Sequence, residues 1–230
     1  MPPHDLVFSL GPNCRNAWNT RSHFGVTRAY PFDWWITPAK AMLQMLDPGF
    51  AFHVLPGDLV VTPTVGDGEN SVYNRRLNLL HHHDFPRRDR QVQEIRPDDI
   101  AALNDKYAAL FARFRQDVAD ARAPLALVNG IARGWPQEPG GTGRPDRHLN
   151  GAIAPQELVD GIRSRLGSKV TVAIVTVGPE QVIRLDGGVQ VSRPDLGRRE
   201  PRGTVPGYAE PVHAFRACYQ TLGLEPAGPG

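Results

Sequence analysis

Short apolar runs alternate along the chain with longer segments in which apolar residues recur every three or four positions. Residues 6–10, 125–128 and 170–177 are such apolar runs, and turn-forming residues follow the first two. Runs of this length predict buried strands, and the β-branched run 170–177 is typical of a strand covered on both faces. Residues 182–191 are interrupted by Asp186-Gly187-Gly188, which predicts a β-hairpin.

Five segments carry helix signals. Asn13 is a good N-cap for a helix that ends at Gly25, and Thr37-Pro38 begins a second helix. The clearest helix starts near Asp98, and its apolar residues recur with the helical period: Ile100, Leu103, Tyr107, Leu110, Phe111, Phe114 and Val118. Two more helices are predicted, over residues 155–166 and 212–222.

The alternation of strands and helices predicts a single α/β domain over residues 1–230, with a mostly parallel or mixed sheet covered by helices. Residues 1–97 carry the sequence motifs, residues 98–224 complete the sheet, and residues 225–230 are expected to be a frayed tail. Within residues 50–97, which are rich in turn-forming residues, two short strands are expected, at 59–61 and 71–73.

Composition narrows the class of protein. With 40% hydrophobic and 22% charged residues the chain is ordinary for a globular domain, and a net charge of +2 is too small to indicate nucleic acid as a partner. No apolar run is long enough to enter a membrane. The start of the chain does not resemble a secretory signal, and the two cysteines lie far apart, so we expect free thiols and a cytoplasmic location.

Cys14 is the candidate nucleophile. It falls in the first turn of the helix that follows the first strand, where the helix dipole and free backbone amides favour a thiolate. The same amides can hold an oxyanion during acyl transfer, and Asn13 either adds a side-chain donor or only caps the helix. The alternative is that Cys14 is simply a small packed residue.

Histidine is the usual base for a thiol, and the run at residues 81–83 stands out. In an extended segment His81 and His83 share a face, while Asp84 points elsewhere unless the backbone turns. The alternative is a polar surface segment. No metal and no other cofactor is expected, because Cys-x-x-Cys, His-Glu-x-x-His and glycine-rich phosphate loops do not occur.

Three segments in one order carry a resemblance: Ser-Leu-Gly-Pro-Asn-Cys ending at Cys14, Pro-Phe-Asp-Trp ending at Trp34, and His-Asp-Phe beginning at His83. This set resembles a bacterial family of unknown function described as papain-like cysteine peptidases. The resemblance implies that Cys14 is the nucleophile and His83 the base, acting on a peptide or other acyl substrate. It leaves Asp84 and Asp33 both open as the third member of a triad.

The same resemblance implies an α+β papain-like fold as the alternative to the alternating α/β pattern. The aromatic segment 31–35 also has two interpretations. It is either a core plug or a functional segment, in which Asp33 orients a histidine or Trp34 lines a substrate site.

Two other functions fit the sequence. An esterase layout of the SGNH type would use Cys14 with His213 and Glu210, which are spaced as an acid-x-x-His pair. A non-catalytic module for glycans or nucleotide-sugars would use the polar loops at 62–76 and 134–151 as its rim. Cysteine chemistry separates these hypotheses, because a binding module has no need for a thiolate.

Overall fold

A computed structural model describes residues 4–63, 69–129, 153–197 and 212–224, which form an α/β fold with two sheets. The main sheet has the strand order β1-β6-β7-β9-β8. Its parallel strands are β1 (Leu6–Ser9), β6 (Pro124–Asn129), β7 (Thr171–Val177) and β9 (Gly188–Arg193). The hairpin strand β8 (Gln181–Leu185) lies antiparallel to β9 at the edge.

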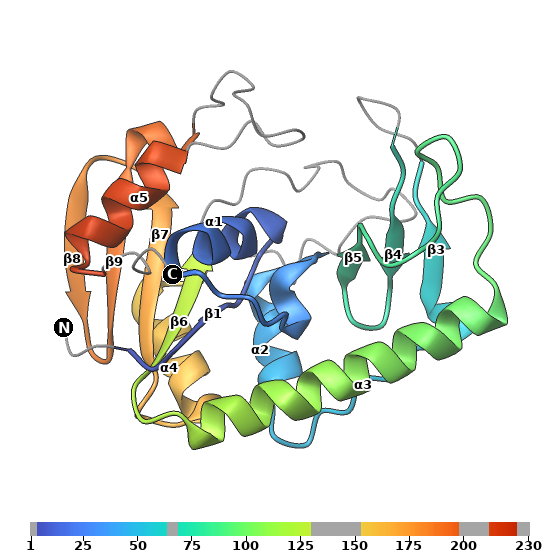
Figure 1. The fold of residues 1–230 in the computed structure, drawn as a ribbon, viewed down its shortest axis with the longest axis horizontal. Helices are drawn as coiled ribbons and strands as arrows, with labels where there is room; N and C mark the ends of the chain where they lie inside the picture. Colours follow the sequence, from blue (N-terminus) through green and yellow to red (C-terminus); the bar gives the residue numbers. More distant parts are fainter. Residues whose placement is uncertain (1–3, 64–68, 130–152, 198–211, 225–230) are drawn as a thin grey trace.

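Helices cover both faces of the main sheet (Figure 1). One face packs on α2 (Ala39–Leu46), α3 (Pro97–Asp120) and α4 (Pro155–Leu166), through a core that includes Phe8, Val128 and Val172. The other face packs on α1 (Cys14–Phe24) and α5 (Val212–Thr221), through residues such as Leu127 and Val175. Successive residues of a strand point to opposite faces, so both cores draw on the same strands.

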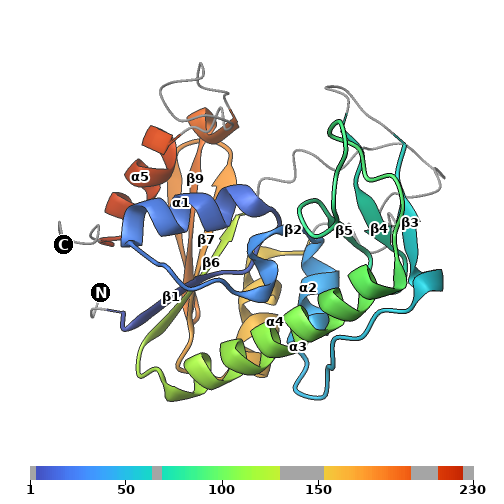
Figure 2. The same ribbon diagram turned by 45° about the vertical axis from the view of Figure 1, so that its right-hand side comes forward.

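A second, antiparallel sheet lies between α1 and α3 in the sequence. Its strand order is β2-β5-β4-β3, with β2 at Trp35–Ile36, β3 at Leu59–Val61, β4 at Val72–Asn74 and β5 at Leu79–His81. The long helix α3 passes beneath both sheets (Figures 1 and 2). With 24 residues, α3 is about 36 Å long, so one helix reaches from the second sheet to the main sheet.

Most predicted elements are confirmed. The strands at 6–10, 125–128 and 170–177, the hairpin, and the helices starting at Cys14, Pro97, Pro155 and Val212 are all present. Asn13 caps α1 and Gly25 ends it with a left-handed backbone, at φ 63°. The predicted tail 225–230 and loop 134–151 lie outside the described residues.

Two expectations needed correction. The second helix begins at Ala39 and not at Pro38, because the backbone of Pro38 is extended, at φ −58° and ψ 149°; the N–H of Thr37 just before it donates to Pro12 O at 2.7 Å. The short strands β3 and β4 lie at or within one residue of the expected 59–61 and 71–73, whereas the strand β5, which leads into the histidine run, was not expected. Within the described ranges, no helix combines the length and the apolar composition needed to cross a membrane.

Candidate functional site

Cys14 opens α1 directly after the loop that leaves β1 at the carboxyl edge of the main sheet. The helix is capped by Asn13, whose Oδ1 accepts the N–H of Arg15 at 3.2 Å. This bond uses only the oxygen of the Asn13 amide. Cys14 is partly exposed, whereas Cys218 is fully buried among apolar side chains, and this burial raises the pKa of the Cys218 thiol to about 12.

The loop that carries Cys14 is held by the buried Asn16. Its Nδ2 lies 2.9 Å from Ser9 Oγ, 3.1 Å from Gly11 O and 2.7 Å from Leu127 O. These partners belong to the end of β1, the loop and β6. One side chain therefore holds the start of α1 against two parallel strands of the main sheet.

The same loop is joined to the second sheet. Pro12 O accepts the N–H of Thr37, the residue that follows β2, and β2 pairs with β5 so that Trp35 lies opposite His81. Figures 1 and 2 both show the N-terminal end of α1 on the side that faces the second sheet. The structure thus brings the cysteine loop and the strand before the histidine run into one region.

The histidine run does not remain extended beyond β5. Strand β5 ends at His81 and the chain bends over the next four residues. His81 is 1% exposed, whereas His83 lies at the surface. The expectation that these two histidines share a face is therefore wrong, because the bend turns one inward and the other outward.

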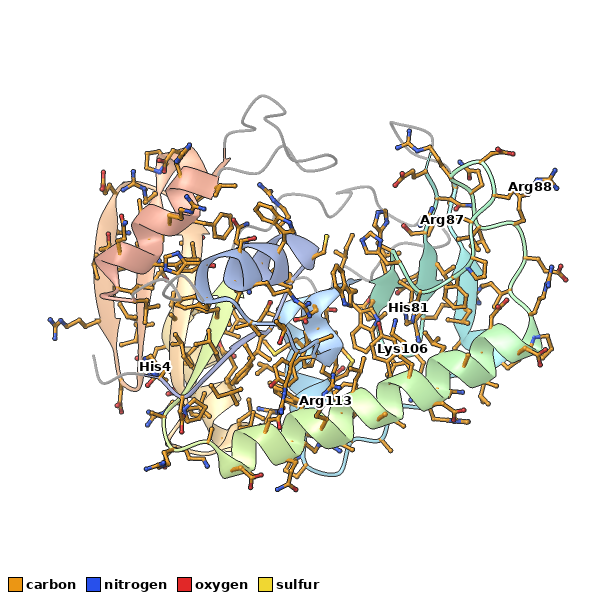
Figure 3. All side chains as sticks on the ribbon, viewed as in Figure 1. His4, His81, Arg87, Arg88, Lys106 and Arg113 are labelled. Carbon is orange, nitrogen blue, oxygen red and sulfur yellow. The ribbon has the colours of Figure 1, made fainter. Side chains whose placement is uncertain are left out.

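Asp84 follows the bend inward, and its side chain is fully buried. One carboxylate receives hydrogen bonds from Trp35 Nε1 (3.0 Å), Lys106 Nζ (2.6 Å) and the Tyr107 hydroxyl (2.8 Å), and His81 Nδ1 lies 2.8 Å from it. Burial by itself raises the pKa of Asp84, but the bonds and charges of His81 and Lys106 outweigh burial and hold this pKa well below its usual value. Figure 3 shows His81 and Lys106 on the side of β5 that faces α3.

His83 stands next to Asp84 in sequence but on the outside. Its ring meets Trp34 edge-on, with centroids 5.8 Å apart, and partial removal from water lowers its pKa, with a smaller contribution from His82. Trp34 is half-buried, and the guanidinium of Arg21 lies 5.3 Å from its ring centroid. Trp34 is therefore placed between α1 and His83.

His82 is bound on both sides of its ring. Its Nδ1 lies 3.0 Å from Ser71 Oγ, and its Nε2 lies 3.5 Å from Glu69 Oε2. Of the three histidines, His83 is the most exposed. Among the described residues, its ring contacts are with Trp34 and His82.

Asp33 does not contact a histidine among the described residues. Its Oδ2 accepts from Arg21 at 2.7 Å and from the Tyr30 N–H at 2.9 Å. Burial raises the pKa of Asp33, and these two bonds oppose the rise. Asp33 joins the segment before β2 to α1, while Phe32 and Trp35 are fully buried, so the interpretation of a core plug is confirmed for those two aromatic residues.

The residues of the esterase layout lie elsewhere. His213 is exposed in the first turn of α5, and Glu210 lies outside the described residues. The contact between α5 and α1 joins their later turns, where the rings of His23 and Tyr219 lie 4.8 Å apart. Cys14 is the first residue of α1 and His213 lies in the first turn of α5. The ring contact between the two helices is at their last turns and does not join Cys14 to His213.

Several residues of this region had no signal in the sequence. Lys106 and Tyr107 appear there only as a polar and an apolar position of a long helix, and Asn16 and Arg21 as ordinary polar positions. Within the described ranges, no three His, Cys, Asp or Glu side chains gather closely enough to hold a metal ion. Comparisons with protein-family models, curated proteins and solved structures found no significant match.

Proposed function

We propose that the protein is a cysteine-dependent hydrolase of the papain-like peptidase type. Cys14 is the nucleophile and His83 the general base, and the substrate is an amide or ester of a peptide or another acyl compound. The observation that carries the proposal is the hydrogen bond from Thr37 N–H to Pro12 O. This bond joins the loop of the partly exposed thiol to the strand pair that leads into the histidine run.

His83 is the best base in this run. His81 is buried against Asp84, and His82 is bound by Ser71 and Glu69, so neither is free to meet a substrate. Partial removal from water lowers the pKa of His83, so its ring holds a proton best when an anion lies beside it, and in the proposed pair the Cys14 thiolate is that anion. Asp84 supports the proposal indirectly, by holding the bend that turns His83 outward.

The reaction follows from these positions. His83 takes the proton of the Cys14 thiol, and the thiolate attacks the carbonyl carbon of the substrate. Nδ2 of Asn13, which the capping bond leaves unused, donates to the oxyanion at the positive end of the α1 dipole. The C–N or C–O bond breaks, the leaving group departs with the proton from His83, and water hydrolyses the thioester to release the acid and the free thiol.

The test is the pH dependence of Cys14 alkylation by iodoacetamide, followed by mass spectrometry of the peptide that contains Cys14. We expect a Cys14 pKa below the ordinary value of about 8.5, and a rise of about one unit or more in His83→Ala. His53→Ala is the matched control, because His53 is exposed in a loop. Cys218 does not need to be removed, since it is fully buried.

Other results would contradict the proposal in different ways. A rise in the Cys14 pKa in His213→Ala alone would favour the esterase layout. A thiol that titrates normally in every variant would leave Cys14 without a base and favour the glycan or nucleotide-sugar binding module.

A further inference from the structure

The strand β8 is the outer edge of the main sheet and carries exposed apolar side chains. Three large hydrophobic residues are exposed in the described part of the chain, and two of them lie on β8: Val182, 51% exposed, and Ile183, 38% exposed. The strand has no Lys or Pro and pairs residue by residue with β9 without a bulge, so the exposed Arg184 is the one charged side chain on this edge. Figure 1 shows it at the outer margin of the sheet.

We propose that two copies of the chain associate through β8, which pairs antiparallel with β8 of the second copy around a two-fold axis at Val182. The two main sheets then form one continuous sheet. A two-fold axis makes such an interface self-complementary, so it closes at a dimer.

The backbone of β8 is oriented for this pairing. Val172 N–H donates to Gly187 O and Gly178 N–H donates to Arg193 O, so the odd-numbered residues of β9 bond to β7. The even-numbered residues of β9 therefore bond to β8, and their partners there are odd-numbered. This leaves the N–H and C=O groups of Val182 and Arg184 pointing to the open edge.

Charge selects the register. With the axis at Val182, each Val182 faces its counterpart. Glu180, whose Oε1 also accepts from Arg193 of its own chain at 2.9 Å, lies opposite Arg184 of the second copy, which makes two pairs of opposite charge. The next register that the backbone allows toward the hairpin turn has its axis at Ile183 and sets Glu180 opposite Asp186 of the second copy. Like charges directly opposite one another destabilise a strand pair.

The affinity is expected to be modest. A strand of five residues buries less surface than a typical permanent dimer, so the dissociation constant should be roughly micromolar. Light scattering on the full chain over a range of concentrations should show the mass rise from 25.3 kDa toward twice that value.

Val182→Lys should raise the dissociation constant at least about tenfold, because it removes the central apolar contact and sets two like charges together. Leu55→Lys is the matched control, since Leu55 is 54% exposed but lies away from this edge, and it should leave the constant unchanged. Arg184→Glu should also weaken the dimer, because it sets a glutamate opposite Glu180 of the second copy. Since Arg184 is exposed, this variant replaces Val182→Lys as the test if Val182→Lys fails to fold.

Disulfide trapping tests the register. In a Cys14→Ser background, Val182→Cys should form an intermolecular disulfide on oxidation, since the Cα atoms of a hydrogen-bonded pair lie about 5.5 Å apart. Ile183→Cys should not, because Ile183 faces Gln181 of the second copy. A chain that stays monomeric at every concentration would overturn the proposal. A dimer without the Val182→Cys disulfide, or one that Leu55→Lys weakens equally, would also overturn it.

Discussion

Trp35 donates its indole N–H to the buried carboxylate of Asp84 at 3.0 Å, and the residues just before each of them meet at the surface. There the rings of Trp34 and His83 lie 5.8 Å apart. The buried pair Trp35–Asp84 and the surface pair Trp34–His83 thus both join the start of β2 to the bend after β5. The buried pair determines where the surface pair stands, so the position of the proposed base depends on the ion network beneath it.

Asp84→Asn should lower the free energy of unfolding by about 2–4 kcal/mol, because it breaks a buried ion network while keeping the side-chain volume. The loss stays below that of a wholly buried pair, since Lys106 is half exposed and can turn to water. Urea denaturation measures the change. Asp89→Asn, at a side chain that is 93% exposed, should change stability by less than about 0.5 kcal/mol. Equal effects of the two changes would contradict this account of Asp84.

Stability should also fall in acid because of Asp84. Its pKa is lower in the folded chain than in the unfolded chain, so its contribution is complete above the unfolded value of about 3.9 and is lost as the pH falls toward the folded value. Asp33, whose pKa is raised, works in the opposite sense. The difference in stability between wild type and Asp84→Asn should therefore shrink below about pH 4. A difference that stays constant from neutral to acid pH would be evidence against this.

Asn16→Ala should destabilise the protein by about 1–3 kcal/mol, because Ser9 Oγ and two backbone carbonyls lose a buried donor. Asn19→Ala is the comparison, since the amide of Asn19 is also buried but, among the described residues, donates within its own helix, to Arg15 O. Its effect should be smaller. If Asn16 also holds the cysteine loop, the pH profile of Cys14 alkylation should shift in Asn16→Ala and not in Asn19→Ala.

The two cysteines should differ in reactivity in the native protein. Iodoacetamide at about pH 8 should modify Cys14 and leave Cys218 intact, because Cys218 is fully buried and its pKa is raised to about 12. Both should react in urea. Peptide mass spectrometry measures the two sites in one sample, and native modification of Cys218 at a rate similar to that of Cys14 would contradict the packing of α5.

Trp34→Leu should raise the pKa of His83 toward its ordinary value, because the partial removal from water that lowers this pKa comes in part from the indole ring. NMR titration of the histidine ring protons measures the change. An unchanged His83 curve would mean that its neighbours in the run, and not Trp34, determine its pKa.

Local sequence determined the secondary structure wherever an element is long enough to show its period. The predicted helix 155–166 has the bounds of α4, and the apolar run 170–177 became β7 at the centre of the main sheet. Capping is also local: Asn13 and Gly25 lie next to the backbone groups that they serve, so both ends of α1 were predictable. The position of Cys14 at the start of this helix followed directly.

Only the tertiary structure decided the direction of each side chain in the histidine run. Asp84 turns inward because its donors come from Trp35, 49 residues away, and from Lys106, 22 residues away, and neither is visible in the neighbouring residues. The same packing buries His81 and leaves His83 at the surface. The period of apolar residues predicts which side chains of a regular helix or strand face the core. The direction of a buried carboxylate depends instead on the hydrogen-bond donors that replace its water, and these come from distant parts of the chain.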